Sequence, residues 1–160
     1  MFRWLPGQAR KVDVFSRLER HWYEAGAASV GPRPSNATES EIADFEKTNA
    51  VTLPLDLREY FLRFNGTGDD TDAKLFCFWP IHKLCSLQSN YRGIGEAESY
   101  FIFADFMVES WYYAIYLGDN PSLRHRVILP DFPSHPEIAP DFSAFLELYL
   151  NDDPKLYGNA

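Results

Sequence analysis

The stretch that decides the fold is LPLDLREYFLRFNG, residues 53–66. Its apolar side chains recur at i, i+3, i+4 and i+7, the spacing of one buried helix face: Leu57, Tyr60, Phe61 and Phe64. Pro54 suits the first helical turn, because its missing N–H is not needed there. Gly66 follows the last apolar residue and can adopt the left-handed conformation that ends a helix. The stretch therefore predicts a helix that starts at Pro54 and stops at Asn65–Gly66.

Helical patterns also precede and follow this stretch. Residues 11–25 carry apolar side chains at helical spacing. Thr38 and Glu41 form the capping-box pattern that starts another helix. Residues 142–149 repeat the helical spacing after Asp141, a residue type that caps helix starts, and we expect Pro154 to end this helix. The chain is thus predicted to place three helices before residue 66 and one near its end.

The middle of the chain has a residue composition that differs from that of the helical segments. Four short runs are rich in aromatic and β-branched residues, which favour strands: 74–79, 100–104, 111–117 and 125–129. A turn at 118–121 separates the last two, and residues 80–84 are suited to a short helix. The pattern predicts an α+β fold that contains an antiparallel meander.

Size and composition limit the function classes. The chain of 160 residues is long enough for one domain, which we expect to span 1–160. Its net charge is −8, so nucleic-acid phosphates are repelled, whereas basic partners are attracted. The longest strongly apolar run, 111–117, is far too short to cross a membrane. The first residues lack a signal-peptide pattern and there are only two cysteines, so we expect a cytoplasmic protein.

No motif predicts catalysis. Cys77, His82 and Cys85 lie close in sequence but lack paired zinc-ligand spacing and a fourth ligand, so buried thiols are the simpler interpretation. Residues 66–72 resemble half of a calcium loop, yet the closing glutamate of such a loop is missing. No phosphate-binding loop, dinucleotide fingerprint or hydrolase motif is present. We expect no catalytic residue, no cofactor and no bound metal.

Charge is unevenly distributed along the chain. Residues 37–72 contain nine acidic side chains against three basic ones, whereas residues 1–33 are basic overall. Either these acids are solvated helix faces or they form a patch for a basic partner.

Several segments together carry a family resemblance. SEIADFE at 40–46 and LPLDLREYFL at 53–62, followed by FNG, are similar to the opening helices of the SUKH superfamily. FADF at 103–106 with SWYYAI at 110–115 resembles the family's central hairpin, and IAPDFSAFL at 138–146 resembles its closing helix. The resemblance covers residues 38–153 in order, and the helix at 11–25 has no counterpart in the pattern.

The resemblance implies an α+β fold, in which the N-terminal helices and a C-terminal helix pack around a twisted antiparallel sheet. It also implies a non-catalytic protein. Bacterial members of the superfamily are typically immunity proteins that bind and neutralise a cognate toxin, often a nuclease. Fungal relatives are regulatory interaction modules. The first hypothesis is therefore stoichiometric neutralisation of a toxin domain by a monomer or weak homodimer, with no nucleic-acid or membrane partner. The alternatives are a regulatory adaptor with an endogenous partner and a small enzyme or ligand-binding domain.

We expect the partner contacts among acidic and aromatic side chains on loops and on the open face of the sheet. The candidates are Asp69, Asp70, Asp72, Asp105, Glu109, Trp111 and Asp119. Trp111 has two open interpretations, an exposed interface anchor or a core residue.

Overall fold

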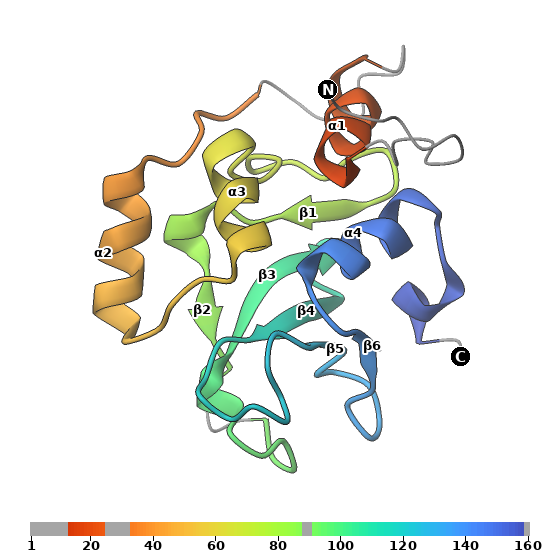
Figure 1. Ribbon diagram of the computed structural model, residues 1–160. Coiled ribbons are helices and arrows are strands. Elements are labelled where there is room, and N and C mark those ends of the chain that lie inside the picture. Colours follow the sequence, from red (N-terminus) through yellow and green to blue (C-terminus); the bar gives the residue numbers. More distant parts are fainter. Residues whose placement is uncertain (1–12, 25–32, 88–90, 159–160) are drawn as a thin grey trace, which may run out of the picture.

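A computed structural model describes residues 13–24, 33–87 and 91–158 (Figure 1). The helices of these segments are α1 (Val14–Glu19, continued by a π-turn over Arg20–Glu24), α2 (Glu39–Asn49), α3 (Leu55–Arg63) and α4 (Phe142–Leu150). The strands are β1 (Phe76–Phe78), β2 (Cys85–Ser86), β3 (Tyr100–Phe106), β4 (Trp111–Tyr116), β5 (Val127–Ile128) and β6 (Glu137–Ala139). Short 3₁₀ turns occupy Ile81–Lys83, Ala97–Ser99 and Pro154–Tyr157.

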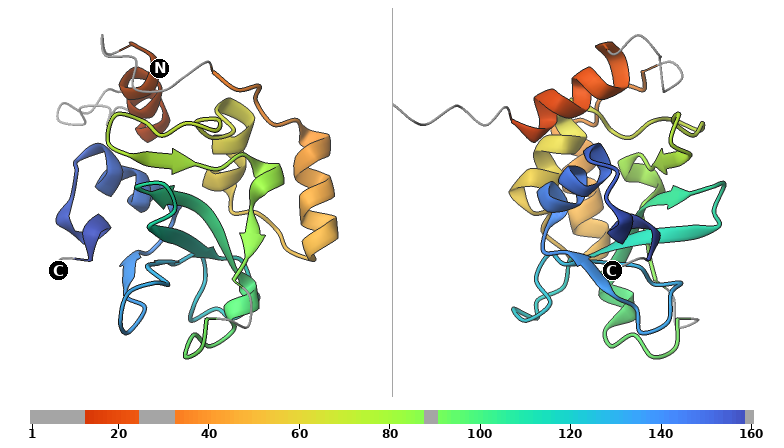
Figure 2. Two further views of the ribbon diagram at one scale, coloured as in Figure 1. Left: turned by 180° about the vertical axis from the view of Figure 1, so that it is seen from behind. Right: turned by 90° about the vertical axis from the view of Figure 1, so that its right-hand side faces the viewer.

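All strand pairs are antiparallel, which confirms the predicted α+β fold and its meander. The strands follow the order β1-β3-β4-β5-β6, and β2 pairs with the part of β3 that β1 leaves free. The central pair is the long β3–β4 hairpin, which projects away from α3 and α4 (Figure 2). The sequence pattern missed β2 and β6, because neither lies in a run rich in aromatic and β-branched residues.

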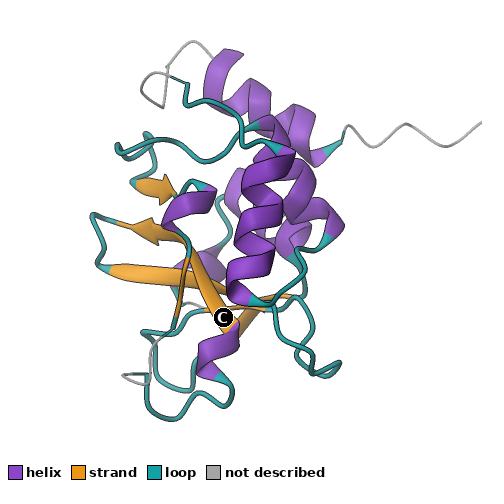
Figure 3. Cartoon of the chain, turned by 90° about the vertical axis from the view of Figure 1, so that its left-hand side faces the viewer, coloured by secondary structure: helices purple, strands orange, loops and turns teal. Residues whose placement is uncertain are grey.

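The longer helices gather on one side of the sheet (Figure 3). Aromatic side chains fill the space between the two layers: the Phe103 ring lies 4.9 Å from Phe145, and Phe78 lies 4.9 Å from Tyr149. The first helix packs on α4, where Arg17 and Glu147 form an ion pair at 2.6 Å. Residues 14–24, which have no counterpart in the resemblance, therefore pack directly against the core.

Helix ends follow the local signals with small shifts. The capping box of Thr38 and Glu41 is present, as predicted. Pro54 is the residue before α3 rather than in its first turn. The chain leaves α3 through left-handed Asn65 and Gly66, with φ of 56° and 86°. The last helix ends at Leu150, and Pro154 starts a separate 3₁₀ turn instead of ending α4.

Candidate functional site

The segment between α3 and β1, residues 67–75, covers the outer edge of the sheet. The Thr67 N–H donates to the Phe78 carbonyl at 3.0 Å, and the Phe78 N–H donates to Thr67 Oγ1 at 3.0 Å. The Asp72 N–H donates to the Phe76 carbonyl at 2.8 Å, and the Phe76 N–H donates to Asp72 Oδ1 at 2.9 Å. An exposed strand edge invites pairing with other chains, so these contacts block it and hold the loop in place.

Asp72 is a buried structural residue, with only 3% of its surface exposed. Its Oδ2 accepts a hydrogen bond from the Tyr149 hydroxyl, which itself accepts one from Trp22 Nε1 at 2.8 Å. The Lys74 ammonium donates to the Tyr149 carbonyl at 3.0 Å. Burial raises the pKa of the Asp72 carboxyl. Asp72 therefore ties the loop to α4 and to the N-terminal helix, so its carboxyl is engaged within the protein, whereas we expected it to contact a partner.

Asp105 is also buried, at 2% exposure, and it positions the end of the β3–β4 hairpin. Its Oδ2 accepts from Trp79 Nε1 at 2.7 Å, and its Oδ1 accepts from the Glu109 N–H at 3.0 Å. Both carboxylate oxygens are thus occupied by groups of the protein itself. Asp105 therefore organises the hairpin end from beneath, whereas we expected it to contact a partner.

The hairpin end, residues 107–110, meets the loop 67–75. The Met107 N–H donates to the Leu75 carbonyl at 2.9 Å. Between the two segments lies a cleft of about 290 Å³, here called the acidic cleft, which is lined by Asp69, Asp70, Thr71, Cys77, Lys83, Asp105, Val108 and Glu109. The fold thus brings four of the predicted acidic residues together, although 35 or more residues separate the two groups in the sequence.

The electrostatics of the acidic cleft are dominated by carboxylates. Asp69, Asp70 and Glu109 are exposed. The one cation of the lining, Lys83, places its ammonium 4.3 Å from the centre of the Trp79 ring. Burial raises the pKa of the Cys77 thiol, which keeps it protonated and unsuited to nucleophilic attack. The acidic cleft therefore carries an excess of negative charge.

The acids of the neighbouring helices are mostly engaged within the protein. Arg58 pairs with Glu39 and Glu46, and Arg63 pairs with Glu59. Much of the negative charge of residues 37–72 thus belongs to solvated helix faces, which was the first of the two interpretations of these acids. The acidic cleft differs from those helix faces because it is lined by exposed acids of the loop 67–75.

Trp111 lies half-buried at the start of β4. Its ring is 4.5 Å from the Phe106 ring and 5.3 Å from the Phe132 ring, and its Nε1 donates to the Tyr113 hydroxyl at 3.1 Å. These contacts favour the structural interpretation of Trp111 over the exposed-anchor interpretation.

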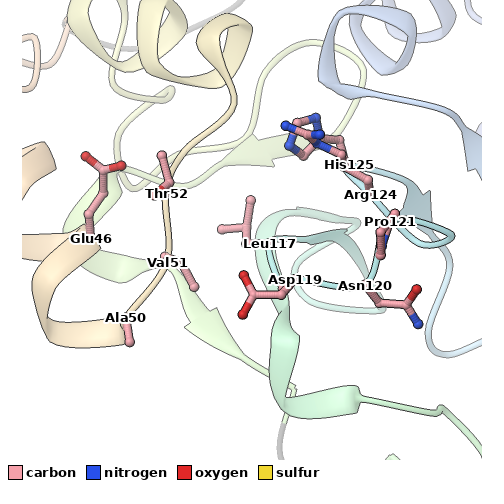
Figure 4. Close-up of a pocket in the computed structure, with 11 residues that line it drawn as sticks. Glu46, Ala50, Val51, Thr52, Leu117, Asp119, Asn120, Pro121, Arg124 and His125 are labelled. Carbon is pink, nitrogen blue, oxygen red and sulfur yellow. The ribbon is translucent and has the colours of Figure 1, made fainter.

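Asp119 lies at a second cleft, of about 440 Å³ (Figure 4). One wall is formed by Glu46 and residues 50–52, and the other by residues 117–121 with Arg124 and His125. Glu46 is occupied there, since it accepts from the Leu53 N–H at 2.9 Å and pairs with Arg58. Asp119 is exposed but does not line the acidic cleft, so the structure separates it from the other candidates.

Exposed apolar side chains beside the acidic cleft were not among the sequence candidates. Leu75 and Val108 are large apolar side chains exposed at 46% and 83% beside the acids. Their residue types favour burial, and Ser110 is the single turn-favouring residue type in the segment MVES at 107–110. No sequence signal could have identified them.

The described part of the chain contains neither a metal-binding group nor a membrane-spanning helix. Over residues 13–24, 33–87 and 91–158, no group of three His, Cys, Asp or Glu side chains is arranged to hold a metal ion. Within that part of the chain, no helix combines the length and apolar character that a membrane crossing requires.

Comparison with known proteins adds one positive match. Residues 36–148, well over half of the chain, match the model of the SMI1 / KNR4 family (SUKH-1). No curated protein sequence matches the chain significantly. The matched region contains α2, α3, all six strands and both clefts, whereas α1 precedes it.

Proposed function

The chain belongs to the SMI1 / KNR4 family (SUKH-1), and from this premise we propose that it is an immunity-type protein that neutralises a toxin domain by binding it. Neutralisation would be stoichiometric, without catalysis and without a cofactor. The proposal includes a cytoplasmic location, a monomer or weak homodimer, and a single domain over residues 1–160.

The observation that carries the proposal is the acidic cleft. Nucleases bind phosphates through basic surfaces, and a surface with Asp69, Asp70 and Glu109 exposed together is complementary to such a surface. Long-range attraction between opposite charges raises the association rate, and it suppresses binding to acidic proteins. A nuclease whose substrate groove is occupied in this way would lose access to nucleic acid.

The proposal is tested with the toxin domain encoded beside the gene of this chain, in a catalytically inactive form. Association is measured by stopped-flow at several salt concentrations. The triple variant Asp69→Asn, Asp70→Asn, Glu109→Gln should associate on the order of tenfold more slowly, with a weaker salt dependence. The matched control is Asp44→Asn, Glu98→Gln, Glu137→Gln, which removes the same charge from exposed positions outside the acidic cleft.

Two outcomes would contradict the proposal. Equal slowing by the triple variant and its control would show that net charge, and not the acidic cleft, drives association. Failure of the wild-type chain to bind the toxin domain, together with stable binding of an endogenous protein, would favour the regulatory adaptor instead.

A further inference from the structure

We propose that three exposed apolar side chains beside the acidic cleft, Leu75, Met107 and Val108, anchor the bound partner, which is a basic protein surface. They are called the docking patch below. The inference rests on the proposed function and adds to it the contact area that would determine affinity. The acids of the cleft would steer the encounter, and the docking patch would slow dissociation.

Exposure is the first observation. The large apolar side chains that are exposed in the described residues are Leu55, Leu75, Met107 and Val108, at 85%, 46%, 48% and 83%. Three of these four belong to the docking patch, although it is built from two segments that are distant in sequence. Single exposed apolar residues are ordinary, whereas a group of them rimmed by polar residues marks an interaction surface.

Backbone conformation is the second observation. All three residues of the docking patch adopt left-handed conformations, with φ of 70° at Leu75, 50° at Met107 and 52° at Val108. This conformation is a clear outlier for a β-branched residue such as Val108. The hairpin end is held by Asp105, by the Ser110 hydroxyl, which donates to the Met107 carbonyl at 2.7 Å, and by the hydrogen bond of Met107 to Leu75. The fold thus keeps apolar side chains in strained positions where they point to solvent, a combination typical of binding sites.

Charge identifies the occupant. Val108 lines the acidic cleft together with Asp69, Asp70 and Glu109, so any molecule seated on the docking patch meets these acids. A second copy of the chain, with its net charge of −8, would be repelled, as would anionic lipid and nucleic acid. An apolar centre with a charged rim is the common anatomy of protein interfaces. The partner should therefore present an apolar depression bordered by lysine or arginine.

The test uses the double variant Met107→Gln, Val108→Thr and the same inactive toxin domain. Threonine keeps the branched shape and glutamine the length, so only the apolar character is removed. The control is Leu55→Gln, because Leu55 is as exposed as Val108 but lies on the first turn of α3, on the helix side of the sheet. The double variant should weaken binding by at least about tenfold, mainly through faster dissociation. The control should stay within about twofold of wild type.

The outcomes separate this inference from the proposed function. Suppose that the double variant dissociates from the toxin domain at the wild-type rate, while the acidic triple variant associates more slowly. This result would overturn the docking patch and leave the proposed function intact. Absence of binding by the wild-type chain would overturn both. Sedimentation of the chain alone tests whether a second copy of the chain occupies the docking patch. A dimer that the double variant abolishes would make the second copy the partner and refute the inference. If the double variant melts at a lower temperature, Leu75→Gln repeats the test from the other segment.

Discussion

Two glycines near the acidic cleft share one backbone conformation but differ in their surroundings. Gly66 has φ of 86° and Gly68 has φ of 84°. A Cβ added at Gly66 would lie 2.5 Å from the Phe78 carbonyl oxygen and 2.9 Å from the Trp79 carbonyl carbon, whereas one added at Gly68 would meet nothing within 4 Å. The pair therefore separates the cost of backbone strain from the cost of lost space.

The expected losses follow from these two contributions. Alanine in a left-handed conformation costs about 1–2 kcal/mol, and about 0.4–1 kcal/mol of this is offset by reduced freedom of the unfolded chain. Gly68→Ala should therefore lower the free energy of unfolding by about 1 kcal/mol. Gly66→Ala carries the same cost and must also move the backbone of β1, for which overpacking adds about 1–3 kcal/mol. Its total loss should be about 2–4 kcal/mol.

Urea denaturation, followed by tryptophan fluorescence and far-UV circular dichroism, measures both variants. The difference between the two losses isolates the close approach of Gly66 to β1. Equal losses would refute the reasoning, because they would show that the chain leaves α3 without pressing against that strand. A loss for Gly68→Ala as large as 3 kcal/mol would refute the strain estimate of about 1–2 kcal/mol.

The remaining predictions concern three side chains. Tyr149→Phe should lower the free energy of unfolding by about 2–3 kcal/mol, because it leaves the Trp22 N–H and a buried carboxylate oxygen unpaired. Urea titration measures this loss. A loss no larger than that of Tyr157→Phe, whose hydroxyl is more accessible, would contradict the prediction. Since the pKa of Asp72 is raised above its usual 3.8, its carboxyl stabilises the fold fully below about pH 4 and loses that contribution as pH rises through the folded pKa. The stability of wild type relative to Asp72→Asn, measured in urea across pH, should therefore fall in that window, and a pH-independent difference would exclude it. Trp111→Ala should cost about 2–3 kcal/mol, below the range for a fully buried ring, and an unchanged melting temperature would restore the exposed-anchor interpretation.

Local order in this protein was largely predictable from the sequence. The capping box of Thr38 and Glu41, the apolar face of residues 57–64 and the left-handed exit at Gly66 all appear where the pattern indicated. Each depends on residues within seven positions of one another, so the information is present in a short window. The family was recognisable for a related reason, because its resemblance is carried by an ordered set of such local patterns.

The identity of the site residues was decided by tertiary structure. Asp69 and Asp72 are the same residue type three positions apart, yet one is exposed and the other is buried. Burial of Asp72 depends on Tyr149 and Trp22, and the occupied carboxylate of Asp105 depends on Trp79, all of which approach only when the sheet and helices are assembled. Neighbouring residues and composition thus determined most of the elements, the α+β class and the acidic character, whereas β2 and β6 were missed. Only the packed chain decided which acids remain free and which apolar side chains stay exposed beside them, because burial is set by groups distant in sequence.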